Sequence, residues 1–149
     1  MEARHFEMAI VAVSALNRCT YCVSLHAPLA EQTGLTPDQV HDLSGPTLGP
    51  LTEDHAFPPR PGFPREDSLV IDLAHFLVWA GVYPHVAPVP SRIVHTLRRR
   101  LFALLAEHFT SRHEELVWRI TQCVAFNWHN EFLEIDVEPG VTPLPVTGG

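Results

Sequence analysis

Apolar residues recur along this chain at the spacing of helices, and no strand-like alternation competes with that pattern. Residues 2–16 predict a first helix, because these apolar side chains gather on one broad stripe: Phe6, Met8, Ile10, Val11, Val13 and Ala15. Asn17 is a suitable residue to break the chain and cap the next helix. That second helix is expected from about Cys19 to Thr33, with Gly34 as its left-handed terminator.

Prolines and glycines divide the middle of the chain. Pro28 lacks the amide that would bond to Ser24 and is expected to kink the second helix. The run Thr36-Pro37-Asp38-Gln39 predicts the start of a short helix, with a capping residue, a proline and an acid in order. Residues 44–65 predict a long Pro/Gly-rich loop, which is either an inserted surface connection or a cover for a pocket or subunit contact.

The second half of the chain returns to helical spacing. Three helices are expected there: Arg65 to about Val82, one capped by Ser91 and ending near His108, and one capped by Ser111 and ending near Glu134. We therefore predict a single all-α domain over residues 1–138, an antiparallel helical bundle of about six helices. Residues 139–149 contain several prolines and predict a flexible tail.

Length and charge narrow the classes of function. A chain of 149 residues with 46% hydrophobic and 18% charged residues suits one globular domain with its own core. A net charge of −7 argues against a general binder of nucleic acid or of anionic membranes. The apolar segment Met8–Leu16 is too short for a membrane span, which needs about 18 residues, and it lacks a signal-peptide cleavage site. We expect a cytoplasmic protein.

The densest chemistry lies in the run Cys19-Thr20-Tyr21-Cys22-Val23-Ser24-Leu25-His26. Only a thiolate is a good nucleophile, and an ordinary cysteine titrates near ~8.5. A helix start supplies unpaired amides and a dipole that favour an anion, and Arg18 adds a nearby cation. His26 lies one turn beyond Cys22, and the two thiols share a helix face. This arrangement is typical of thiol redox chemistry and points to an enzyme.

Glu7 extends this group from the preceding helix. If the two helices form an antiparallel hairpin that turns near Asn17, Glu7 lies about 15 Å down one arm and His26 about 10 Å down the other. The two side chains can then meet at a similar depth. A carboxylate beside His26 would fix the tautomer of the imidazole.

Other interpretations of the cysteine pair remain open. Zinc could use Cys19, Cys22 and His26, with Cys123 or His129 as a distant fourth ligand, although structural zinc usually shows a second tight pair. A structural disulfide or inert buried thiols are the plainer alternatives. A c-type haem site is excluded because Val23 stands where histidine is required, and no βαβ pattern supports a thioredoxin fold. We expect no cofactor and no metal.

Three residues of the last predicted helix share one face. Cys123 is either a small buried hydrophobe or a second resolving thiol. Asn127 and Asn130 follow on the same face at helical spacing. They either bond the end of the helix or form a polar pocket wall near the thiols.

Glu7, Cys19, Cys22 and His26 together resemble a family signature: Glu, eleven residues, Cys, two residues, Cys, three residues, His. It belongs to the alkylhydroperoxidase D-like group of the carboxymuconolactone decarboxylase superfamily. Gly34-Leu35-Thr36 looks like the turn after the redox helix of that family. The run Phe126-Asn127-Trp128-His129-Asn130 is similar to a common family ending.

This resemblance implies a thiol peroxidase or disulfide oxidoreductase that assembles as a trimer or hexamer. By that analogy Cys22 attacks the peroxide oxygen and becomes a sulfenic acid, which Cys19 resolves to a disulfide. His26, with Glu7 behind it, takes the proton of the thiol. A dithiol reductant such as a lipoylated protein then reopens the bridge. The alternatives are a decarboxylase-like lyase, which needs a base but no paired thiols, and a non-catalytic assembly module.

Overall fold

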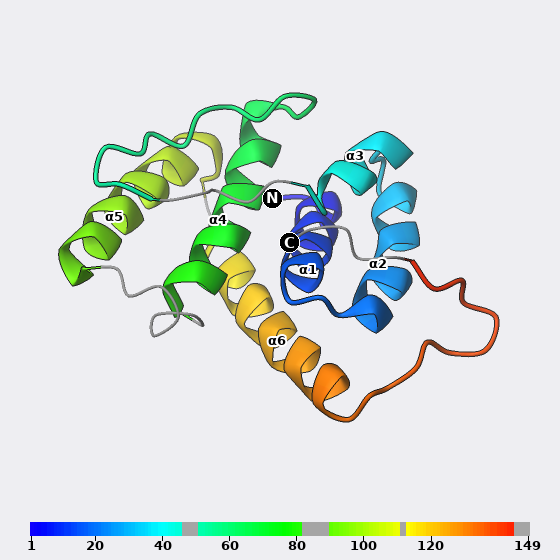
Figure 1. Ribbon diagram of the computed structural model, residues 1–149. Coiled ribbons are helices and arrows are strands. Elements are labelled where there is room, and N and C mark those ends of the chain that lie inside the picture. The colour runs from blue at the N-terminus through cyan, green and yellow to red at the C-terminus, as the bar shows by residue number, and fades with distance from the viewer. Residues whose placement is uncertain (46–50, 82–89, 111–112, 145–149) are drawn as a thin grey trace.

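The computed structural model describes residues 1–45, 51–81, 90–110 and 113–144. In these residues the chain forms six helices and no strand, which confirms the all-α prediction (Figure 1). The helices are α1 (Ala3–Leu16), α2 (Thr20–Gln32), α3 (Pro37–Asp42), α4 (Arg65–Gly81), α5 (Ser91–His108) and α6 (His113–Phe132). No helix within the described ranges is long and apolar enough to cross a membrane.

Helix α1 is the centre of the packing and contacts α2, α4 and α6. Figure 1 shows it between α2 on one side and α4 on the other, with α5 beyond α4. A helix covered on several sides must be apolar around most of its circumference. The buried side chains of α1 satisfy this condition: Met8, Ala9, Val11, Ala12, Val13 and Ala15. Phe6 and Ile10, expected on the same stripe, are only partly buried.

The turn between α1 and α2 differs from the expected one by two residues. Asn17 ends α1, and its amide donates to the Val13 carbonyl at 2.9 Å. Arg18 then adopts the left-handed conformation with φ of 58° and reverses the chain. Cys19 therefore becomes the capping residue of α2, and its sulfur accepts a hydrogen bond from the Cys22 amide at 3.3 Å. The prediction that Asn17 caps α2 is wrong.

Two other helix ends follow from local sequence. Gly34 follows Thr33, the C-cap of α2, and has φ of +110°, as its terminator role predicted. At the start of α3 the Thr36 hydroxyl accepts from the Gln39 amide at 3.2 Å, and the Gln39 side chain accepts from the Thr36 amide at 3.0 Å. The cap of α5 is Pro90 and not Ser91, which is the first helical residue. The expected cap Ser111 lies outside the described residues.

Residues 51–64 contain no helix, as their composition predicted. They are pinned to α4 and α5 by polar contacts, in which Arg60 Nε donates to Asp72 Oδ1 at 3.0 Å and Arg100 donates to the Glu53 carbonyl at 2.8 Å. Phe57 anchors the segment, since it is fully buried and meets Phe76 edge-on at a centroid distance of 6.3 Å. Burial of this ring is the main apolar contribution of the segment to the core.

A buried ionic cluster joins α1 to α4. His5 Nε2 lies 3.0 Å from Asp67 Oδ1, and both side chains are buried. The Arg4 guanidinium bridges Asp67 at 3.1 Å and Glu66 at 3.0 Å. A buried carboxylate needs such partners, because an unpaired one would lose its hydration without compensation.

The chain after α6 returns to α2, as the orange and red segment of Figure 1 shows. The Tyr21 hydroxyl donates to Glu138 at 2.9 Å, and the Leu144 amide donates to the Ser24 hydroxyl at 2.8 Å. The flexibility of residues 139–149 and the 1–138 domain boundary remain predictions.

Replacing Phe57 by alanine should destabilise the fold by about 3–5 kcal/mol, because a fully buried ring is lost and a cavity is left. Phe63→Ala in the same segment is the matched control, since Phe63 is only partly buried against the core. It should cost less than about 2 kcal/mol. Urea denaturation followed by circular dichroism measures both values. Equal losses would show that the segment is not anchored through Phe57.

Candidate active site

The α1–α2 hairpin brings Glu7 and His26 together. Glu7 Oε2 lies 2.8 Å from His26 Nδ1, and both side chains are about a quarter exposed or less. Glu7 and His26 lie at a similar distance from the turn of the hairpin, because the chain reverses at Arg18 and the two helices are antiparallel. The carboxylate accepts the Nδ1 proton of the imidazole, which leaves Nε2 as the nitrogen available to other groups.

Cys22 is the cysteine of this group whose thiol is the more acidic. Its pKa is lowered to about 6, first by the hydrogen bond from the Cys19 thiol and then by the side-chain amides of Asn130 and Asn127 and the charge of His26. Burial opposes this shift, since a thiolate loses hydration when only 6% of the residue is exposed. The donors outweigh the desolvation, so Cys22 is a thiolate near neutral pH.

The pKa of Cys19 is shifted in the opposite direction to that of Cys22. Cys19 is fully buried, and its pKa is raised far above the usual range by the hydrogen bond to Cys22 and by burial. The amide of Cys22 donates to the Cys19 sulfur, which places the two side chains on one turn. One proton is thus shared asymmetrically between two sulfurs: Cys19 keeps it, and Cys22 is the anion.

Helix α6 supplies a polar wall behind the thiols. Asn127 is fully buried, donates to the Ser14 hydroxyl at 3.0 Å and accepts from the Asn17 amide group at 3.1 Å. Asn130 donates to the Cys22 sulfur at 3.4 Å. Of the two readings of this asparagine pair, the pocket wall near the thiols is the one that the contacts favour.

Cys123 belongs to the same wall but not to the thiolate pair. Its sulfur lies 3.5 Å from the Ser14 hydroxyl. Burial raises the pKa of this thiol to about 11, so it stays protonated at neutral pH.

A pocket of about 330 Å³ opens onto the Cys22 sulfur. It lies between α1, α2 and α6, and its lining residues are Ile10, Tyr21, Cys22, Leu25, His26, Arg119, Gln122, Cys123, Phe126 and Asn130. The pocket gives the buried sulfur a route from solvent. None of the described residues 51–64 lines it, so this part of the predicted loop does not cover the Cys22 pocket.

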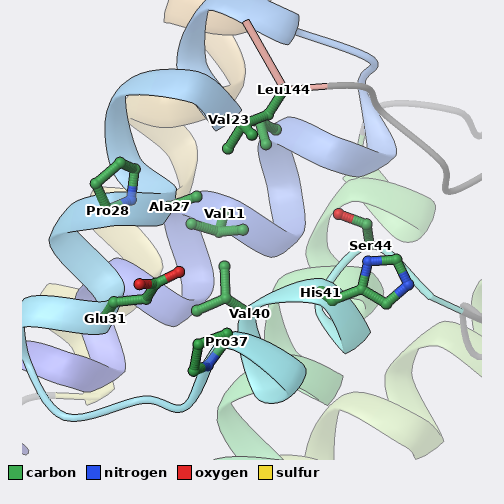
Figure 2. Close-up of a pocket in the computed structure, with 10 residues that line it drawn as sticks. All are labelled: Val11, Val23, Ala27, Pro28, Glu31, Pro37, Val40, His41, Ser44 and Leu144. Atoms are coloured by element: carbon green, nitrogen blue, oxygen red, sulfur yellow. The ribbon is translucent and has the colours of Figure 1, made fainter. Parts of the chain in front are cut away.

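Another pocket of about 330 Å³ lies on a different face of α2 (Figure 2). Val23, Ala27 and Glu31 contribute from α2 at helical spacing, and Leu144 lies over Val23 at one end. Its wall holds no thiol. Cys22 and His26 line the other pocket together, so that pocket is the candidate site.

The zinc alternative is not supported by the donor geometry. Within the described residues, ligand atoms of three His, Cys, Asp or Glu side chains gather within 4.8 Å at His5, Glu66 and Asp67, and Cys19, Cys22 and His26 form no such group. His26 directs Nδ1 at Glu7 instead. At the gathered cluster the Arg4 guanidinium already bridges both carboxylates.

Arg18 does not act on the thiols as expected. It is exposed, and it is not among the causes of the lowered Cys22 pKa. The left-handed turn at this residue explains the difference, because the reversal directs α2 back along α1 and leaves Arg18 at the outer edge of the turn.

The fold and the site together define an all-helical protein with a paired-thiol centre. Residues 1–47 match the family model of the carboxymuconolactone decarboxylase family. This match confirms the family resemblance over the segment that carries Glu7, Cys19, Cys22 and His26, and it spans α1, α2 and α3. No curated protein and no solved structure matches the chain.

Alkylation of Cys22 by iodoacetamide should rise with pH to half its maximum near pH 6, because its lowered pKa makes it an anion above that value. Cys123, with a raised pKa of about 11, should react only in strong alkali. Peptide mass spectrometry after timed alkylation measures each thiol separately. A Cys22 midpoint at the ordinary value near 9 would contradict the electrostatic description.

Proposed function

We propose that this protein is a thiol peroxidase or disulfide oxidoreductase that works through Cys22 and Cys19. The observation that carries the proposal is the Cys22 sulfur itself, an anion that shares a pocket with His26 and lies one turn from a protonated partner thiol. A nucleophilic sulfur, a proton-handling pair and a resolving sulfur are the three parts that such chemistry needs.

In the first step the Cys22 thiolate attacks one oxygen of a peroxide. An S–O bond forms, the O–O bond breaks, and sulfur transfers two electrons to the peroxide. His26, held by Glu7 at 2.8 Å, first takes the proton of the Cys22 thiol on its Nε2 and then returns this proton to the departing oxygen, which leaves as water or an alcohol. Cys22 is then a sulfenic acid.

In the second step Cys19 attacks the sulfenic sulfur. The Cys19 thiol loses its proton, an S–S bond forms, and the hydroxyl group of the sulfenic acid leaves as water. A dithiol reductant, with a lipoylated protein as the proposed partner, reopens the bridge by exchange and becomes a disulfide itself. Each turnover therefore needs one peroxide and one dithiol.

We further propose that the chain works as a homo-oligomer, a trimer or hexamer, in the cytoplasm. Support for a covered surface comes from the large apolar side chains that α6 and the residues after it leave exposed: Trp118, Phe126, Trp128, Phe132 and Leu133. Exposed apolar groups of this size commonly mark interaction surfaces.

Cys22→Ser should abolish peroxide consumption, because serine is not a comparable nucleophile at neutral pH. His26→Gln should lower kcat/KM by about 100-fold, the usual loss when a general acid–base group is removed. His41→Gln is the matched control, since His41 is exposed on α3 and outside the Cys22 pocket. Stopped-flow mixing with peroxide and a dithiol reductant measures these rates.

In wild-type protein, one equivalent of peroxide should consume two thiols and yield the Cys19–Cys22 disulfide, seen by peptide mapping. Full turnover by Cys22→Ser would exclude the proposed chemistry. A decarboxylase activity that survives alkylation of both cysteines would instead favour a lyase in which the His26–Glu7 pair acts as a base.

A further inference from the structure

The segment that matches the family model ends at residue 47, but the Cys22 sulfur is also contacted from α6. Asn130 Nδ2 lies 3.4 Å from Cys22 Sγ, a distance typical of a hydrogen bond to sulfur, and only 7% of Asn130 is exposed. Water therefore cannot easily replace this donor. The contact joins residues that are 108 positions apart in the chain.

The orientation of the Asn130 amide is set by its neighbour. His129 Nδ1 lies 3.2 Å from Asn130 Oδ1. Because a carbonyl oxygen only accepts, the imidazole must donate its Nδ1 proton to this oxygen. That bond leaves the amide nitrogen, with its two protons, directed at the sulfur.

We propose that Asn130 is a further catalytic residue of this site, which donates to the Cys22 sulfur and stabilises its anion before attack, and that His129 is the positioning residue that orients its amide. The catalytic role of Asn130 rests on the proposed function. Its hydrogen bond to the Cys22 sulfur does not, because that bond needs only the thiolate. In the attack on peroxide the donor also stays on the sulfur while an electron pair moves to the new S–O bond.

Several other titratable groups act near the same sulfur, and the test must separate them. They are Cys19 at the N-cap of α2, Tyr21 and His26 on α2, Glu7 on α1, and Arg119, Cys123 and Glu131 on α6. All of them stay unchanged in a variant that alters only Asn130. A change in the titration midpoint of Cys22 therefore reports the lost amide donor.

The experiment measures the pH midpoint of Cys22 alkylation in the full-length protein. Asn130→Leu removes the donor at similar volume, and the midpoint should rise from about 6 by about one pH unit. Asn130→Asp keeps the shape of the side chain but places a carboxylate against the sulfur, so its midpoint should rise further. His129→Leu should give a smaller rise in the same direction.

Thr121→Val is the matched control on α6, since this side chain is exposed and its hydroxyl donates to the Val117 carbonyl of its own helix. Its midpoint should stay at the wild-type value. A side chain that merely ties α6 to α2 would lower thermal stability in Asn130→Leu without moving the midpoint, and that result would overturn the proposal. A Cys22 midpoint in Asn130→Asp at or below the wild-type value would also overturn it. This second measurement can be made even if the leucine variant fails to fold.

Peroxide kinetics on the same variants keep the two proposals distinguishable. If wild-type protein consumes no peroxide but Asn130→Leu still shifts the alkylation midpoint, the proposed function fails and the assignment of Asn130 as the thiolate donor stands. If wild-type protein turns over and Asn130→Leu shows the wild-type midpoint and the wild-type kcat/KM, the proposed function stands and the role of Asn130 fails.

Discussion

A thiolate beside a second thiol is stable only when that second sulfur keeps its proton, and Cys19 at the start of α2 meets this condition. Its full burial opposes its own ionisation, while its proton stabilises the Cys22 anion. Two cysteines in equivalent surroundings would share the charge equally, and neither sulfur would be singled out as the nucleophile. The difference in their surroundings decides which sulfur is the nucleophile and which sulfur then closes the disulfide.

That asymmetry depends on the α1–α2 hairpin and on the helix that crosses it. The hairpin sets Glu7 against His26 at 2.8 Å, and α6 adds Asn127 and Asn130 from the opposite side. Each donor is worth more in this half-buried pocket than in water, because the local dielectric is low. Burial, which alone would raise the Cys22 pKa, therefore strengthens the interactions that lower it.

The Glu7–His26 contact could be predicted from spacing, because a tight hairpin converts sequence distance into depth along two helices. The cap at Cys19 could not, since a left-handed Arg18 is a non-glycine residue and leaves no signal in the sequence. The contact of Asn130 with Cys22 depends on how α6 packs across α2, which no local pattern encodes. The ion pair between the partly buried Arg4 and the buried Asp67 joins two helices distant in sequence, and no local pattern encodes it either.

The unequal protonation of the three thiols can be measured by infrared spectroscopy, because each protonated thiol contributes to the S–H stretching band. The S–H band should lose the intensity of one thiol as the pH rises through about 6, and Cys22→Ser should remove this step. The bands of Cys19 and Cys123 should remain in place over the same range. Intensity from all three S–H groups at neutral pH would show that Cys22 is an ordinary thiol and that no thiolate is held at this site.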